Sequence, residues 1–125
     1  MKTIFYIALG GGLGSVLRYL TSLFFTKFQL GNFPLGTFVA NVVGCFLIGV
    51  FFGYFEKQTG SSQDLKFFLI TGICGGYTTF SAFSNENIQL IQNNQIGTAF
   101  LYTALSIVLG FGMTYLGLQI IKSFF

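Results

Sequence analysis

Long apolar runs separated by short polar stretches make up most of the chain. A helix that crosses a membrane needs about 20 predominantly apolar residues, and four runs of that order can be drawn. The polar stretches between them, KFQLGNFP, EKQTGSSQD and QNNQ, are typical of turns. An even number of spans places both chain ends on one side of the membrane. We therefore predict four membrane-spanning helices, at about residues 4–25, 35–55, 65–91 and 97–124.

The third run carries an interruption, GGYTTFSAF, at residues 75–83. Gly75 and Gly76 weaken a helix, and two β-branched threonines follow shortly after. We expect this helix to be broken near its middle. Backbone freed by a break is tolerated at membrane depth only where it is buried in protein or lines a cavity. Such a break exposes carbonyls, which bind cations, and N–H groups, which favour anions.

Composition supports the membrane interpretation. Hydrophobic residues make up 53% of the 125 residues and charged residues only 7%, whereas a soluble domain has about a quarter of its residues charged. The mean hydropathy is +0.75. The sequence therefore predicts an all-α integral membrane protein, with residues 1–125 forming a single membrane domain. A net charge of +3, scattered along the chain, is too sparse for nucleic-acid binding.

Charge specifies the orientation weakly. By the predicted spans, one side of the membrane carries the chain ends and the second loop, and the other side carries Lys27. The excess of lysines leans towards chain ends inside. Glu56 and Asp64 lie among these lysines and reduce the bias. The lysines on the side of the chain ends are Lys2, Lys57, Lys66 and Lys122.

Glycines recur at a spacing that brings helices close together. Small residues four apart allow two membrane helices to approach each other closely. Packing between helices is the simple interpretation for most of these glycines. A four-helix unit has little interior of its own, so close-packing faces on several helices also suggest a homodimer or a larger assembly. The pairs with this spacing are Gly10/Gly14, Gly49/Gly53 and Gly72/Gly76.

Several polar side chains fall inside the predicted spans, where each needs a partner or a function. Arg18 has snorkelling to the interface as an alternative, and a lone hydroxyl can bond to its own helix. An amide in mid-span, as at Asn41, must find partners on a neighbouring helix or an ion. The remaining polar residues are Thr78, Thr79, Ser81 and Ser84 in the third span, and Tyr102, Thr103 and Ser106 in the fourth.

Phe80 and Phe83 lie one turn apart on the same face of the helix after the interruption. With 18 phenylalanines in the chain, packing against lipid is the simple alternative for any pair. An aromatic ring has a positive edge, so rings turned edge-on can coordinate an anion without a formal charge that would trap it. The polar neighbours of this pair favour that interpretation.

Three motifs carry a resemblance over nearly the whole chain: GGGLGSVLRY, PLGTFVANVVGCFLIG and GICGGYTTFSAFS. With them the chain resembles the Fluc (CrcB) family of fluoride channels. The resemblance implies an antiparallel, dual-topology homodimer with two fluoride pores in the cell (inner) membrane. It further implies passive, selective export of cytoplasmic fluoride, and hence fluoride resistance, without coupling to ATP or protons.

The resemblance also assigns roles to individual residues. The rings of Phe80 and Phe83 would line the pores, and the amide of Asn41 would donate to fluoride. The backbone carbonyls of Gly75 and Thr78, from both subunits, would hold one structural sodium ion at the dimer centre. The remaining members of the fluoride pathway would be Arg18 at its vestibule end, Thr37, Tyr102 and Ser106 in its polar track, and Thr79 and Ser81 near the break.

Two positions depart from the family pattern. Ala82 stands where the family commonly has threonine, and Gly110 stands one turn after Ser106, where a relative can carry serine. Each departure removes a hydroxyl, so we expect a shorter polar track than in other members.

Other functions remain as alternatives. A small proton-coupled drug or cation exporter needs a carboxylate inside the membrane, and we place Glu56, Asp64 and Glu86 at span ends or in loops. A non-transporting membrane scaffold would use the glycine faces but would leave Asn41 and the interruption unexplained. An enzyme is not predicted, because we find no triad, metal cluster or phosphate loop, and the chain has no histidine.

Overall fold

The computed structural model describes residues 2–28, 30–58, 60 and 62–125. The first two helices are α1 (Lys2–Phe25) and α2 (Leu35–Lys57), and the last is α6 (Ile96–Phe124). Between α2 and α6 lies a third membrane segment. It consists of α3 (Gln63–Lys66), the π-helix η1 (Phe67–Cys74), α4 (Gly75–Tyr77) and α5 (Phe80–Gln92). Within the described residues, four helical segments are long and apolar enough to cross a membrane. The predicted all-helical, multi-pass membrane protein is thus confirmed.

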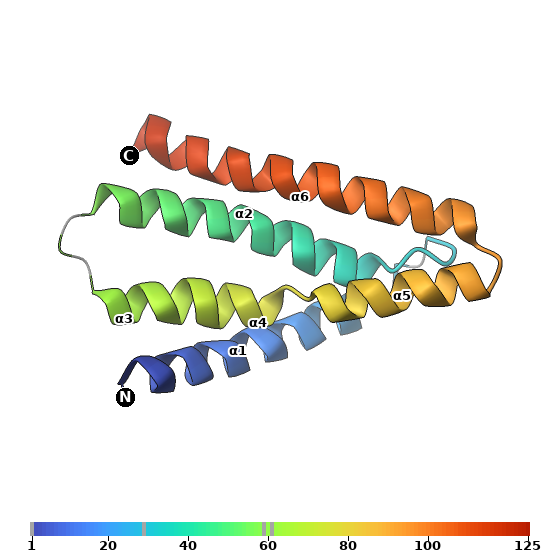
Figure 1. Ribbon diagram of the computed structural model, residues 1–125, viewed down its shortest axis with the longest axis horizontal. Helices are drawn as coiled ribbons and strands as arrows, with labels where there is room; N and C mark the ends of the chain where they lie inside the picture. Colours follow the sequence, from blue (N-terminus) through green and yellow to red (C-terminus); the bar gives the residue numbers. More distant parts are fainter. Residues whose placement is uncertain (1, 29, 59, 61) are drawn as a thin grey trace.

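The helices lie side by side in an elongated bundle (Figure 1), with the start of α1, the end of α2 and the end of α6 at the same end. The most extensive contacts are not between consecutive helices: α1 packs on η1 and α4, and α2 packs on α6. Beyond residues 78–79 the third segment changes its main partner, because α5 contacts α6. The interruption therefore lies where the third segment passes from one helix pair to the other.

Glycines on α1 allow its close contact with the third segment. A Cβ atom at Gly14 would collide with the backbone of Ile73 and Tyr77, and one at Gly10 would collide with the backbone of Phe68. Gly72, on the opposite helix, faces Gly10 directly. The two helices consequently pack backbone to backbone, as small residues permit in membranes.

A second set of glycines joins α2 to α6. A Cβ at Gly49 would strike the carbonyl of Thr114, and one at Gly117 would strike the backbone of Phe46. These faces are therefore occupied within one chain. The glycine spacing thus serves helix packing within the chain, and the homodimer stays a prediction.

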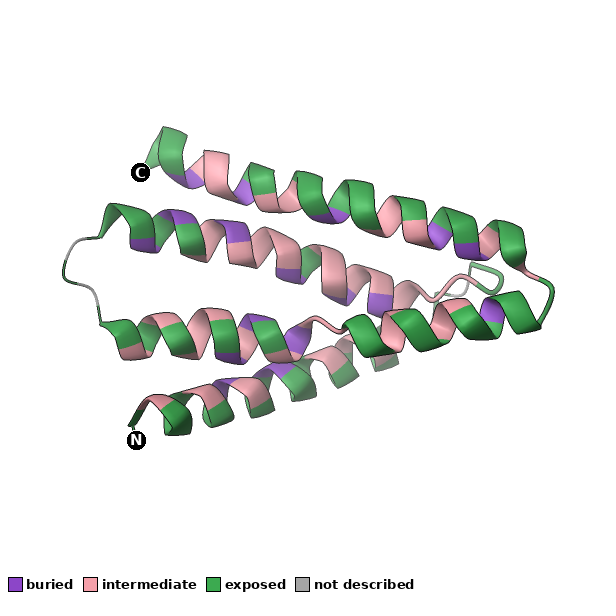
Figure 2. Cartoon of the chain, viewed as in Figure 1, coloured by how far each residue is buried: buried purple, intermediate pink, exposed green. Residues whose placement is uncertain are grey.

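Buried residues follow the inner faces of the helices, and the outer faces are exposed (Figure 2). Large apolar side chains dominate the exposed surface, including Val16, Val108 and Phe111. Such a surface suits contact with lipid. The buried side chains are Thr37, Ala40, Phe55, Cys74, Tyr77, Leu90, Ala99, Tyr102 and Ile121.

The helix ends are secured by specific contacts. Pro34 precedes the first turn of α2, where proline is well tolerated. Lys57, the last residue of α2, donates from Nζ to the carbonyls of Ile121 (2.8 Å) and Lys122 (3.2 Å) near the end of α6. A cation at a helix C-terminus is favourable, so Lys57 links the C-terminal ends of the two parallel helices.

The first prediction concerns the α2–α6 contact. Gly49→Ala places a methyl group against the Thr114 carbonyl, and we expect it to destabilise the fold by about 1–3 kcal/mol through overpacking. Gly112→Ala, on the open face of α6 where nothing lies within 4 Å, is the matched control and should not destabilise. Thermal unfolding in detergent, followed by circular dichroism, measures both. Equal stability of the two variants would contradict this helix pairing.

Candidate functional site

The centre of the candidate site is the short non-helical stretch between α4 and α5. Thr78 (φ −87°, ψ 153°) and Thr79 (φ −150°, ψ 118°) have extended backbones. Thr79 caps α5, because its Oγ1 accepts a hydrogen bond of 3.1 Å from the N–H of Ala82. Ala82 thus takes part in the site through its backbone. The π-helix η1, which the sequence pattern does not predict, ends directly before α4.

Asn41, about two turns into α2, binds this stretch with both ends of its amide. Its Oδ1 accepts from the N–H of Thr79 (2.8 Å), and its Nδ2 donates to the carbonyl of Thr79 (3.2 Å). The expectation that Asn41 needs a partner on a neighbouring helix therefore describes its position well. Its predicted role as a fluoride donor is a separate matter and stays a prediction.

Arg18 approaches the same stretch from α1. Its Nε donates to the carbonyl of Gly76 over 3.2 Å, near the C-terminal end of α4, where a positive charge is favourable. One turn further along α1, the hydroxyl of Thr21 lies 2.8 Å from that of Tyr77. Arg18 thus touches the interruption rather than reaching only towards the membrane interface.

Phe80 and Phe83 form a ring pair after the interruption. Their centroids are 5.8 Å apart, with an angle of 43° between the ring planes. Phe80 is 79% exposed in the single chain, whereas Phe83 is half-buried and its ring centroid lies 5.0 Å from that of Tyr102. The Phe83 ring is therefore packed within its own chain, whereas most of the Phe80 ring is exposed.

A groove of about 360 Å³ runs along these rings between α2, α5 and α6. Ser106, from α6, faces it with a buried hydroxyl that has no hydrogen-bond partner among the described residues. Gly110 lines the groove beside Cys45 and adds no polar atom. The groove brings together six of the predicted site residues: Asn41, Thr78, Thr79, Phe80, Phe83 and Ser106.

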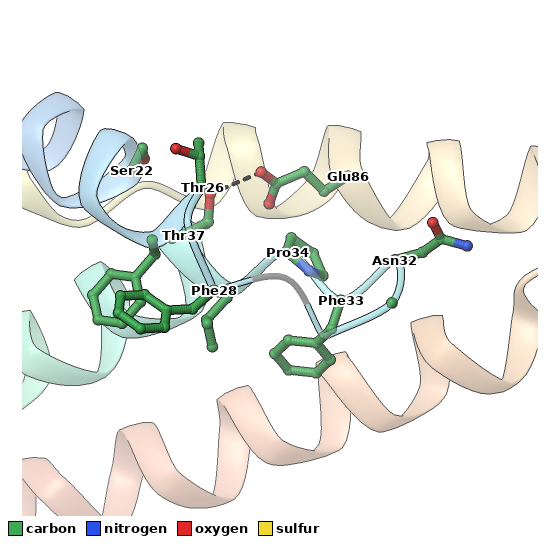
Figure 3. A pocket seen from close by; sticks show the side chains of 12 residues that line it. Ser22, Thr26, Phe28, Asn32, Phe33, Pro34, Thr37 and Glu86 are labelled. Atoms are coloured by element: carbon green, nitrogen blue, oxygen red, sulfur yellow. Dashed lines mark hydrogen bonds between the residues drawn. The ribbon is translucent and has the colours of Figure 1, made fainter.

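Two other predicted residues belong to a separate polar cluster. Thr37 donates from Oγ1 to Glu86 Oε2 (2.8 Å), and the hydroxyl of Tyr102 donates to Glu86 Oε1 (2.9 Å). Figure 3 shows Glu86 reaching from α5 towards Thr37, beside a pocket of about 370 Å³. Glu86 thereby links α5 to both α2 and α6.

Sequence reasoning missed Glu86 as a site residue. It lies about two turns before the end of α5, near the predicted span end, but it is half-buried and bonded to two other helices. Its spacing of three residues from Phe83 places both on one helix face. That spacing was the signal that could have identified it.

The other predicted residues lie around the groove. Ser81 is exposed, and its Oγ lies 3.2 Å from Thr79 Oγ1. Gly75 is exposed on the surface of the single chain. Arg18 lies on the α1 side of the interruption, outside the groove lining.

Comparison with known proteins places these features in a family. The family model described as "CrcB-like protein, Camphor Resistance (CrcB)" matches residues 5–118. The chain belongs to the CrcB family. The resemblance noted from the three motifs is therefore confirmed over nearly the full length.

Several members of the CrcB family carry the name "Fluoride-specific ion channel FluC". The relative from Flavobacterium psychrophilum is 69% identical over 122 residues, covering 98% of each chain. The relative from Azobacteroides pseudotrichonymphae is 44% identical over 125 residues, covering 100% of this chain and 99% of its own. The relative from Ignicoccus hospitalis is 44% identical over 119 residues, covering 94% and 93%.

The second prediction concerns the Glu86 cluster. Tyr102→Phe keeps the ring but removes the donor to Glu86, and we expect a loss of about 1–3 kcal/mol in the free energy of unfolding, because a half-buried carboxyl oxygen loses its hydrogen-bond donor. Tyr115→Phe, at an exposed position of α6, is the matched control. Denaturant unfolding in detergent micelles measures both. A Tyr102→Phe protein as stable as the control would show that the bond contributes nothing.

Proposed function

We propose that the protein is a passive, selective fluoride channel. The observation that carries this proposal is the groove, in which the Asn41 amide, two phenylalanine rings and the Ser106 hydroxyl meet, the last without a hydrogen-bond partner in the described part of the chain. The names of its full-length relatives support fluoride as the permeating ion. The groove lining, apart from the backbone, offers neutral donors and apolar surface only.

The physical problem of permeation explains why such a lining is suitable. Moving an isolated ion into a medium of low dielectric constant costs on the order of tens of kcal/mol. The lining must replace the water around fluoride while binding weakly enough to release it. Hydroxyl groups, the amide and the positive ring edges do this without a formal positive charge, which would hold the anion too long. The negative interior of a cell then drives fluoride outward, so the proposed direction is export.

The proposed assembly is an antiparallel homodimer inserted in both orientations. The exposed ring of Phe80 and the open side of the groove support it, because one chain encloses only part of the pathway. Weak charge asymmetry between the two ends of the bundle is compatible with insertion in either direction.

We further propose that the carbonyls of Gly75 and Thr78 from two subunits hold a structural sodium ion. Carbonyl oxygens suit this hard cation, and both groups lie at the end of a half-helix, where negative partial charge gathers. A sodium ion there would neutralise those oxygens and join the two third segments at the centre of the dimer.

Glu86 is the one observation that favours the rival proposal of a proton-coupled exporter. It places a half-buried carboxylate within α5. Two hydroxyls already donate to this carboxylate, which suits a structural anchor better than a group that exchanges protons with cations. Transport that follows a pH gradient, rather than a fluoride gradient, would favour the exporter.

The third prediction tests the rings. Phe80→Ile and Phe83→Ile remove the positive ring edges while keeping apolar bulk, so we expect fluoride efflux from proteoliposomes to fall about tenfold or more, a barrier increase of about 1.4 kcal/mol. A fluoride electrode measures it. Phe5→Ile, at an exposed position of α1, is the matched control and should conduct normally. Unchanged efflux in both ring variants would contradict their role.

The fourth prediction tests dual topology. A single cysteine added after Phe125, in a Cys45→Ala, Cys74→Ala background, should react only in part with a membrane-impermeant thiol reagent applied to intact cells. Both orientations then coexist, because the end charges do not select one. Lysed cells supply the total for comparison. Labelling of either all or none of the chains would contradict the antiparallel dimer.

A further inference from the structure

The carbonyls of the interruption differ in what hydrogen-bonds to them. The carbonyl of Cys74 accepts from both the N–H (3.0 Å) and the hydroxyl (2.9 Å) of Thr78. The carbonyl of Gly76 accepts from Arg18 Nε. That of Thr79 accepts from Asn41 Nδ2. These three oxygens are therefore already engaged by protein donors.

The carbonyls of Gly75 and Thr78 differ from these, because the N–H groups that would cover them in a continuous helix donate to side chains instead. In a continuous α-helix each would accept from the N–H four residues later. For Gly75 that donor is the N–H of Thr79, which donates to Asn41 Oδ1 instead. For Thr78 it is the N–H of Ala82, which donates to Thr79 Oγ1. Two side chains thus divert the donors that would otherwise cover these two oxygens.

We infer that Asn41 and the Thr79 hydroxyl are positioning residues for a cation site, holding the Gly75 and Thr78 carbonyls uncovered for sodium. This inference rests on the proposed sodium site and deepens it. The two side chains act indirectly. Each binds a backbone N–H that would otherwise donate to a ligand oxygen, and neither touches the ion itself. One chain therefore positions its own Gly75 and Thr78 carbonyls without contacts from a second subunit.

The packing of Thr78 also supports a fixed position for its carbonyl. Its hydroxyl is bonded to Cys74, and its methyl group faces Gly44 on α2, where a Cβ atom would collide with it. Its side chain is therefore held on two sides. Asn41, also on α2, binds the backbone N–H of Thr79, the next residue. Contacts with α2 therefore hold the backbone of both threonines at the site.

The experiment is a sodium titration of thermal stability in detergent, without fluoride, with N-methyl-D-glucamine replacing sodium at constant ionic strength. Wild-type protein should be stabilised by sodium. Thr79→Val and Asn41→Ala should each raise the sodium concentration for half-maximal stabilisation about tenfold or more, as loss of outer-shell partners does at other metal sites.

Two matched variants separate the site from general stability. Thr79→Ser keeps the hydroxyl that accepts from Ala82 and should retain wild-type sodium affinity. Thr114→Val removes a threonine hydroxyl that bonds the carbonyl of Cys45 (3.1 Å) away from the interruption. It should lower stability equally at every sodium concentration, without shifting the half-maximal concentration.

The outcomes distinguish this inference from the proposals on which it rests. If wild-type protein shows no sodium response, the sodium site itself is wrong and the inference fails with it, whatever the fluoride efflux. If wild type responds but Thr79→Val and Asn41→Ala keep its half-maximal concentration, the inference alone is overturned. If these two variants do not fold even at saturating sodium while Thr79→Ser folds, both groups serve folding only, and the inference is also overturned.

Discussion

The pair of hydrogen bonds between Asn41 and the backbone of Thr79 is the interaction on which the middle of the bundle depends. In the hydrocarbon core, each unsatisfied backbone group costs several kcal/mol. The break leaves the N–H of Thr79 without its usual helical acceptor, the carbonyl of Gly75. The side-chain amide of asparagine carries one acceptor and paired donors, so a single residue on α2 accepts from this N–H and also donates to the carbonyl of Thr79.

The other polar side chains near the interruption depend on close helices, which the glycines provide. Backbone contact between α1 and the third segment, through Gly14 and Gly72 among others, brings Arg18 within reach of Gly76. Contact between α2 and α6 through Gly49 places Ser106 on the same groove as Asn41. Larger residues at these glycines would separate the helices and remove the polar side chains from the backbone they serve.

The sequence predicted the four spans and the polar residues of the groove because both follow from local signals. Apolar run length gives a span, and an amide such as Asn41 in mid-membrane demands a partner. The partner itself, Thr79, depends on which helices pack together, and the largest contacts join non-consecutive helices. The same lack of three-dimensional information left open which helices the glycine faces join, and it left Glu86 among the residues of the span ends.

The side of the chain that carries the Glu86 cluster is well packed, whereas the side that carries the groove is open, and this difference is relevant to assembly. On the side of the Glu86 cluster, Tyr102 is fully buried, and the rings of Phe33, Phe38 and Phe83 surround it. On the side of the groove, Phe80 projects outward and the Ser106 hydroxyl has no partner among the described residues. Lipid tails offer no hydrogen bonds, so a bilayer alone leaves that hydroxyl unsatisfied. In the proposed dimer, a second copy would close the open side of the groove, and fluoride or water along it would give the Ser106 hydroxyl a partner.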